Sequence, residues 1–301
     1  MAIHLDAGIV DGFFWYTDSF FLKWKLIGLL GRLQKAKFDT IIYPNYSRKY
    51  PVDWLVHQVS ATTKIGVDGD CTNETAMLKK KSDAFYSALI AVDHSPLHEF
   101  ERNRQIIESI SGEKYECSGP YLEKDKLDIK PNNSIVMFPG ASVSAKKWAP
   151  SNYNKLCRKI NAKLPNRMIL VAGKDDDAET FPITEGIPGD RITIETGLNM
   201  ISLCRLIGGA DVLISGDTVA VHIAASLGVR AICIYNGDHF GRFVPYPTAI
   251  YDKVNCVLPP GFVPPAEAKY RVSAFNVNDV LPDHVFDALT KTLAVTSPHS
   301  I

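Results

Sequence analysis

The chain has 301 residues, enough for two domains of ordinary size, and 46% of them are hydrophobic, as in globular proteins. Lysine and arginine together number 33, as do aspartate and glutamate, and this balance disfavours nucleic acid as a partner. The 6 cysteines lie far apart and form no CxxC pair, which predicts reduced, structural thiols.

Short apolar runs and helical patterns predict an α/β organisation for the N-terminal part of the chain. In chain order we expect strands at 3–5 and 13–16, a helix that ends near residue 33, a buried strand at 39–43, a helix at 52–59, a strand at 64–67, a basic surface segment at 76–81 and a helix at 97–110. The polar, proline-bearing stretch 118–133 is the best candidate for a linker between two domains.

The early apolar stretch 13–33 predicts an amphipathic helix. Its apolar face is formed by Phe20, Phe21, Trp24, Ile27, Leu30 and Leu33. Charged residues interrupt the stretch, so it is not a transmembrane span, and no signal peptide opens the chain. We expect this face to pack in the core, and contact with a membrane or a partner is the alternative.

The part beyond the linker predicts repeated strand–helix units. In chain order we expect a strand at 134–138, a helix at 151–164, a strand at 168–171, a helix at 199–210, a strand at 212–215, a helix at 218–227, a strand at 231–235, an irregular proline-rich segment at 254–270 and a helix at 277–293. The predicted division is an N-terminal domain at 1–128, a C-terminal domain at 129–280 and a helix with a tail at 281–301.

Glycines and polar residues gather where four of the predicted strands end. The four groups are Gly140, Ser142 and Lys146; Gly173 and Asp176; Asp217 and Thr218; and Asn236, Gly237, Asp238 and His239. In an open α/β sheet, ligands bind at the loops that follow the carboxyl ends of the strands. Together the four loops predict a nucleotide-binding site.

Asp217 and Thr218 are expected at the N-terminus of a helix. Unpaired backbone N–H groups and the positive end of the helix dipole would receive a diphosphate there, while Asp217 caps the helix or holds a hydroxyl of the ligand. His222, four residues beyond Thr218, shares its face of the helix. The alternative is an ordinary N-cap at Asp217 and a satisfied core histidine at His222.

The series PGASVSAKKWAP, a Gly-Asp turn, a helix and ADVLISGDTVAVHIAASLG resembles glycosyltransferase family 9, the ADP-heptose:lipopolysaccharide heptosyltransferases and their relatives. The resemblance covers about residues 37–247 and is most specific from 138 to 246. The family's pattern is a Gly-x-Ser turn, a lysine two residues before a tryptophan, and Asp-Thr-Gly-x-x-His at the start of a helix. In this chain the pattern falls on Gly140, Ser142, Lys146, Trp148, Asp217, Thr218 and His222.

This resemblance implies a GT-B architecture, in which two Rossmann-like domains face one cleft, the N-terminal domain holding the acceptor and the C-terminal domain the nucleotide sugar. It implies inverting transfer of a sugar such as heptose from a nucleoside diphosphate donor such as ADP-heptose. The implied acceptor is a glycan or lipid-linked molecule of a bacterial surface polysaccharide or lipopolysaccharide. Such transferases need no metal in general, and they work in the cytoplasm, at the inner face of the inner membrane.

By the same resemblance, Lys146 and Asp217 are the expected catalytic residues. Lys146 would meet the negative charge that develops on the leaving phosphate, assisted by the helix N-terminus at Thr218; its alternative is a solvated surface lysine. The expected donor-binding residues are Gly140, Ser142, Lys146, Gly173, Asp176, Asp217, Thr218, His222, His239 and Arg242. The adjacent acids at 175–177 are expected to cap a helix or hold ribose hydroxyls rather than a metal.

The chain departs from the family pattern at three places. Val219 stands where the family has glycine after Asp-Thr, which would change the approach of the backbone to the phosphate. The family's opening strand and Gly-Asp turn, whose aspartate is the expected acceptor base, have no counterpart, so the N-terminal domain is expected to be incomplete. Asp6, Asp11 or an acid from a partner would replace that base.

The third departure is the turn NGDHFGRFVPY, which is more like a branch with an HFGRF sequence among surface-polysaccharide transferases. His239 and Arg242 could contact the donor phosphate or sugar there. Alternatively, His239 caps the loop and Arg242 snorkels across Phe240 and Phe243. The competing functions are a nucleotide-sugar-binding homologue or partner subunit without catalysis and, last, an epimerase whose catalytic acids the sequence does not place.

Overall fold

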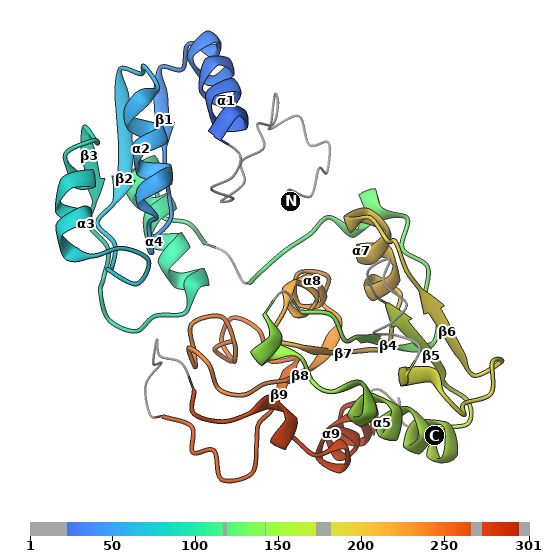
Figure 1. The fold of residues 1–301 in the computed structure, drawn as a ribbon. Helices are drawn as coiled ribbons and strands as arrows, with labels where there is room; N and C mark the ends of the chain where they lie inside the picture. Colours follow the sequence, from blue (N-terminus) through green and yellow to red (C-terminus); the bar gives the residue numbers. More distant parts are fainter. Residues whose placement is uncertain (1–22, 117–118, 142, 173–181, 266–272, 295–301) are drawn as a thin grey trace. The chain divides into compact units, whose positions relative to one another are not determined.

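The computed structural model describes residues 23–116, 119–141, 143–172, 182–265 and 273–294. The chain divides into two compact units, an N-terminal unit within His4–Glu116 and a C-terminal unit within Cys117–Ile301 (Figure 1). Each unit is α/β and contains one parallel sheet. The strands expected at 3–5 and 13–16 lie outside the described residues.

The N-terminal unit is built on a sheet of order β1-β2-β3, in which Ile42 pairs with Ile65 and Val67 with Ile90. Its elements are α1 (Lys23–Ala36), β1 (Thr40–Ile42), α2 (Tyr50–Gln58), β2 (Thr63–Val67), α3 (Ala76–Asp83), β3 (Ala88–Ile90) and α4 (Glu99–Ser111). The helix α1 confirms the predicted helix that ends near residue 33, and its Leu29 is buried while Leu30 and Leu33 are partly buried.

One expectation for this unit was wrong, and a second is made more specific. The strand at 39–43 was expected to be buried, but Thr40 and Ile42 of β1 are exposed, because β1 pairs with β2 alone among the described strands. The segment 76–81 was expected to be a basic surface, and Lys80 and Lys81 are exposed; the segment forms the helix α3, which Thr75 caps. Lys79 of this helix is largely enclosed between Asp68 and Asp83, at 2.8 and 3.0 Å.

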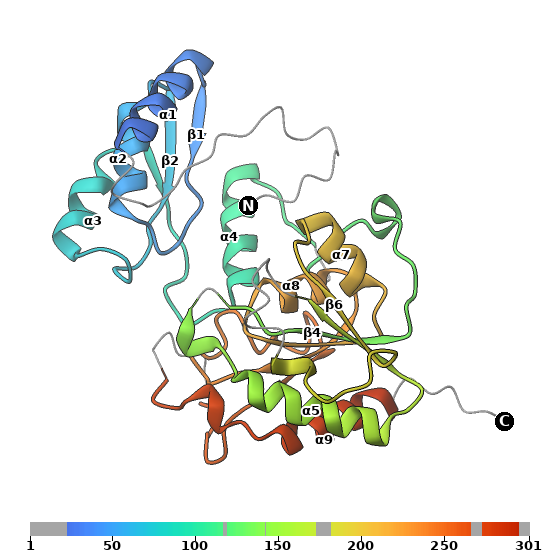
Figure 2. The ribbon, with the colours of Figure 1, turned by 45° about the vertical axis from the view of Figure 1, so that its right-hand side comes forward.

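The C-terminal unit is built on a parallel sheet of order β6-β5-β4-β7-β8-β9. Its strands are β4 (Ser134–Phe138), β5 (Met168–Ala172), β6 (Ile192–Glu195), β7 (Val212–Gly216), β8 (Arg230–Ile234) and β9 (Val254–Val257). Its helices are α5 (Pro150–Lys163), α7 (Met200–Gly208), α8 (Val219–Ser226) and α9 (Pro282–Ala294), with short turns η2 (Lys124–Leu127), η3 (Ser144–Lys146) and η4 (Val277–Asp279). The helices α5 and α9 cover one face of the sheet, and α7 and α8 cover the other (Figures 1 and 2).

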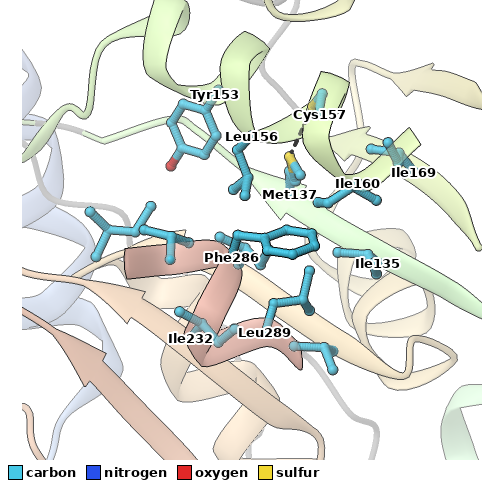
Figure 3. Close-up of a cluster of buried hydrophobic side chains, with 14 of the residues drawn as sticks. Ile135, Met137, Tyr153, Leu156, Cys157, Ile160, Ile169, Ile232, Phe286 and Leu289 are labelled. Atoms are coloured by element: carbon cyan, nitrogen blue, oxygen red, sulfur yellow. Dashed lines mark hydrogen bonds between the residues drawn. The ribbon is translucent and has the colours of Figure 1, made fainter. Parts of the chain in front are cut away.

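The main core of the C-terminal unit lies between the sheet and the pair α5 and α9 (Figure 3). Leu156 and Ile160 of α5 and Leu289 of α9 are completely buried against the strands, and each such side chain contributes about 1.5–3 kcal/mol. The Cys157 thiol lies 3.4 Å from the sulfur of Met137, and burial raises the pKa of this thiol to about 12. All five described cysteines are free, as expected, although Cys71 is exposed.

Two expectations for the C-terminal unit also need correction. The segment 254–270 was expected to be irregular, but it begins with β9, which pairs with β8 through Cys256 and Cys233. The helix expected at 277–293 is divided into η4 and α9, since Pro282 has no backbone N–H and stands at the start of α9. No helix in the described part of the chain is long and apolar enough to cross a membrane.

Candidate functional site

The expected site residues that the structure describes lie in loops after β4, β7 and β8 of the C-terminal unit, except His222, which is on α8. The strands β4 and β7 are neighbours, and Phe138 pairs with Ser215 at their carboxyl ends. The two loops that follow are therefore side by side. Gly216 makes this possible, because a Cβ atom there would lie only 3.1 Å from the carbonyl oxygen of Lys146.

Lys146 and Asp217 form an ion pair at this edge of the sheet. The ammonium group of Lys146 donates a hydrogen bond to Oδ2 of Asp217, although the two residues are 71 positions apart. The Asp217 side chain is 6% exposed and that of Lys146 is 26% exposed. Lys146 is therefore held at the site by a nearly buried carboxylate, and the alternative of a solvated surface lysine does not describe it.

The loop that carries Lys146 is anchored by Trp148. Nε1 of this buried side chain donates to the carbonyl oxygen of Val280 at 2.9 Å, and its ring meets Tyr153 edge-on with centroids 4.8 Å apart. The backbone N–H of Ala149 donates to Oδ1 of Asn278 at 2.7 Å. These bonds fix the loop to the segment that precedes α9, so the position of Lys146 is set by the core rather than by its own turn.

The N-terminus of α8 follows directly on Asp217, but Asp217 does not cap it. Thr218 is the N-cap, because its hydroxyl oxygen accepts from the N–H of Ala220 at 3.3 Å. The same hydroxyl lies 3.0 Å from that of Ser215. Among the described residues the N–H of Val219 has no partner, and its side chain is 47% exposed. This N–H and the helix dipole make the first turn of α8 suitable for an anion.

His222 lies one turn further along α8. Its Nδ1 is 2.6 Å from the hydroxyl oxygen of Tyr246, and the two rings meet edge-on. Burial lowers the pKa of His222, and Lys146 lowers it further, whereas Asp217 raises it. The imidazole is therefore neutral at pH 7. Tyr246 was not recognised from the sequence, although it ends the turn NGDHFGRFVPY that drew attention to His239 and Arg242.

The loop after β8 carries His239 and Arg242. His239 has a left-handed backbone with φ of 50°, its carbonyl accepts from the N–H of Arg242 at 2.9 Å, and its Nδ1 is enclosed without a hydrogen-bond partner. The guanidinium of Arg242 lies 5.1 Å from the ring centroid of Phe243. This is the expected contact with Phe243, but Arg242 is buried, with 8% exposure, and so does not snorkel into solvent.

The remaining candidates differ in how much the structure says of them. Gly140 is partly buried, and a Cβ atom there would meet only the ring of Phe138, at 3.6 Å, so the space beside this glycine is open. Ser142, Gly173, Asp176 and the proposed bases Asp6 and Asp11 lie outside the described residues. In the ranges that are described, no three acidic, histidine or cysteine side chains are grouped as metal ligands would be.

A separate cavity of about 330 Å³ lies beside α7. It is lined by Asp128, Lys130, Glu195, Leu198, Ser202, Arg205 and Leu206. The lining mixes both signs of charge and includes none of the site residues predicted from the sequence.

The N-terminal unit contains a second group of buried charges. Arg48, 1% exposed, donates to Asp83 and lies 3.8 Å from Asp53, which also accepts from the hydroxyl of Tyr86. Glu74 is 8% exposed, and neither of its carboxylate oxygens has a hydrogen-bond partner. Burial, together with the charge of Asp53, raises the pKa of Glu74. This group links α2, α3 and the loops of its unit.

Solved structures of heptosyltransferases and a related glycosyltransferase resemble the chain. E. coli heptosyltransferase WaaC with ADP-2-deoxy-2-fluoro heptose has a TM-score of 0.68 at 16% identity, covering 91% of this chain and 78% of that one. The glycosyl transferase family 9 protein from Veillonella parvula DSM 2008 has a TM-score of 0.67 at 14% identity, covering 91% and 80%. E. coli ADP-heptose lps heptosyltransferase II has a TM-score of 0.62 at 13% identity, covering 90% and 81%. These likenesses show that the fold is the expected GT-B fold.

No curated protein sequence matches the chain. The sequence model of the family described as glycosyltransferase family 9 (heptosyltransferase) matches residues 28–258, well over half of the chain. These comparisons do not favour the alternative of a binding protein without catalysis. The chain therefore belongs to glycosyltransferase family 9, the heptosyltransferase family, and is a glycosyltransferase.

Proposed function

We propose that this enzyme transfers heptose, with inversion at the anomeric carbon, from ADP-heptose to an acceptor of a bacterial surface polysaccharide or lipopolysaccharide. The observation that carries the proposal is the Lys146–Asp217 pair beside the open first turn of α8. Support for the donor comes from the structures of WaaC, which hold ADP-2-deoxy-2-fluoro heptose or ADP.

In this proposal the diphosphate binds at the N-terminus of α8. The N–H of Val219 and the helix dipole attract its oxygens, and Lys146 supplies a full positive charge. Without the donor, Asp217 neutralises Lys146, so the diphosphate must compete with a carboxylate for the ammonium group. Once the phosphate binds Lys146, the carboxylate of Asp217 is available to accept hydrogen bonds from hydroxyls of the sugar.

The chemical step places the largest demand on Lys146. A hydroxyl of the acceptor attacks the anomeric carbon, and the bond from that carbon to the diphosphate breaks, leaving its electron pair on the phosphate oxygen. The ammonium group of Lys146 stabilises this developing charge, so Lys146→Ala is expected to lower kcat by about 10²–10³. The proton of the acceptor passes to a base, for which Asp6 and Asp11 remain the candidates in this chain.

Calorimetry with ADP and with ADP-heptose tests the proposal. Lys146→Ala should lower the affinity for both ligands by about tenfold or more, because a charge-assisted hydrogen bond is lost. Asp217→Asn should leave the affinity for ADP unchanged or higher, because the phosphate no longer competes with a carboxylate for Lys146. It should lower the affinity for ADP-heptose relative to that for ADP. Lys155→Ala, at an exposed lysine of α5, is the matched control and should change neither. Failure of the wild-type protein to bind any nucleotide sugar would refute the proposal.

A further inference from the structure

Tyr246 and His222 touch in two ways. The hydroxyl of Tyr246 lies 2.6 Å from Nδ1 of the imidazole, and the two rings meet edge-on, with centroids 5.8 Å apart and planes at 68°. Tyr246 comes from the loop after β8, whereas His222 is on α8, so the contact joins two elements of the C-terminal unit. Together the two contacts fix both the position and the rotation of the imidazole ring.

The tautomer of His222 decides which group donates in this hydrogen bond. A separation of 2.6 Å between Oη and Nδ1 fits either a hydroxyl that donates to an unprotonated Nδ1 or an Nδ1–H that donates to the hydroxyl oxygen. Tyr246 packs in a buried cluster with Val221, Tyr235 and Val244, and burial raises the pKa of its phenol, so the hydroxyl keeps its proton. When Tyr246 is the donor to Nδ1, the proton of the neutral imidazole is on Nε2.

The other nitrogen of His222 is available to a ligand. In the described ranges Nε2 has no hydrogen-bond partner, and it is not one of the enclosed polar atoms that lack one, so it reaches the surface of the unit. His222 is four residues beyond the N-cap Thr218, and helical side chains lean towards the N-terminus of their helix. The charges of Lys146 and Asp217 both act on the ring.

We propose that Tyr246 is a positioning residue that fixes His222 as the Nε2–H tautomer, so that His222 offers a neutral hydrogen-bond donor to an anion at the first turn of α8. The identity of that anion as the donor diphosphate rests on the proposed function. The tautomer of His222 does not rest on the proposed function, because the contact with Tyr246 lies within the protein.

The tautomer can be read directly by NMR of the protein labelled with ¹⁵N-histidine, without any ligand. The His222 signals are assigned by their loss in His222→Gln. The wild type should show Nδ1 as an unprotonated nitrogen that accepts a hydrogen bond and Nε2 as a protonated one. Tyr246→Phe keeps the ring contact but removes the hydroxyl, and should convert the signals to a mixture of tautomers. A protonated Nδ1 in the neutral wild-type imidazole would overturn the proposal.

Tyr251→Phe is the matched control for this experiment. Its ring packs edge-on against Tyr246, with centroids 6.0 Å apart, but its hydroxyl donates to the carbonyl of Val229 at 2.9 Å rather than to His222. The control should leave the His222 tautomer unchanged. An equal disturbance in Tyr246→Phe and Tyr251→Phe would mean that Tyr246 has only a packing role, and would contradict the proposal.

Binding of ADP and of inorganic pyrophosphate tests the consequence for a ligand. Tyr246→Phe should lower the affinity for both probes by about five- to tenfold, because one hydrogen bond from His222 to the anion is no longer directed. In the His222→Gln background, where an amide replaces the imidazole, Tyr246→Phe should have no further effect. Equal losses with and without His222 would overturn the proposal. If the wild type binds neither probe, the diphosphate site of the proposed function fails, while the NMR result still decides the role of Tyr246.

Discussion

At the scale of single residues, the site depends on the positive charge of Lys146, which is paired with Asp217 before any ligand binds. Lys146 is held by Asp217, and Asp217 is nearly buried, so neither side chain needs to be ordered when a ligand arrives. Ordering a long side chain costs about 1.5–2 kcal/mol, and this cost is met here during folding rather than during binding. The pair therefore preorganises Lys146. The cost is that a ligand phosphate must compete with the Asp217 carboxylate for the ammonium group.

Glu74 provides a prediction about stability at the same scale. Its folded pKa is raised, so its ionisation destabilises the folded state as pH rises above 4.5, the ordinary value of its pKa, and the cost is absent below that value. Glu74→Gln should therefore raise Tm at pH 7, by about 2–4 °C for each kcal/mol removed. This gain should vanish as pH falls through 4.5.

Thermal unfolding followed by circular dichroism at pH 7 and pH 4 measures this effect. Glu113→Gln, at an exposed glutamate of the same unit, is the control and should show no such dependence on pH. A lower Tm for Glu74→Gln at pH 7 would show that the carboxylate has a stabilising partner.

At the scale of secondary structure elements, the sequence predicted the inner strands better than the outer ones. The strands β4, β7 and β8 are buried runs with two neighbours each, and the helices α5 and α8 also agree with the prediction within a few residues. The strands β3, β6 and β9 were missed. Each has only one neighbour among the described strands, and in β6 and β9 polar residues interrupt the apolar run that makes a buried strand recognisable.

Contacts between distant loops could not be predicted in the same way. Strand order and loop composition indicated that the loops after β4 and β7 share one edge, but not that Lys146 would touch Asp217. The contact between Tyr246 and His222 depends on how the loop after β8 folds back on α8, and no spacing rule describes that path. Asp217 was expected either to cap the helix or to hold a hydroxyl of the ligand, and the register of α8 gives the capping role to Thr218.

The cap itself gives a prediction at the element scale. Thr218→Ala removes the acceptor for the N–H of Ala220 and should destabilise the protein by about 1 kcal/mol. Tm measured without ligand should fall accordingly, while Thr218→Ser should keep most of the stability because its hydroxyl can still accept this bond. If the serine variant loses as much as the alanine variant, packing of the Thr218 methyl group, and not capping, is what stabilises this end of α8.

At the scale of the whole molecule, the two units have separate sheets and separate cores. All the described donor-site candidates are in the C-terminal unit, and α9 contributes Val285 and Leu289 to the core of that unit. We therefore propose that the C-terminal unit is a domain that includes this final helix.

This division predicts that residues 117–301, produced alone, fold and bind ADP with the Kd of the whole chain. Calorimetry on both proteins makes the comparison, and circular dichroism verifies folding of the fragment. Removing α9 from the fragment should abolish folding, because the face of the sheet that it covers would be exposed. A folded fragment that binds ADP much more weakly would mean that the N-terminal unit supplies part of the nucleotide site.

The central claim is that a donor diphosphate binds at the first turn of α8 beside Lys146, and a crystal structure of the protein with ADP tests it most directly. We predict phosphate oxygens within hydrogen-bond distance of Nζ of Lys146 and of the N–H of Val219, with Nε2 of His222 facing the same group. ADP bound elsewhere, for example in the cavity beside α7, with Lys146 still bonded only to Asp217, would contradict the account.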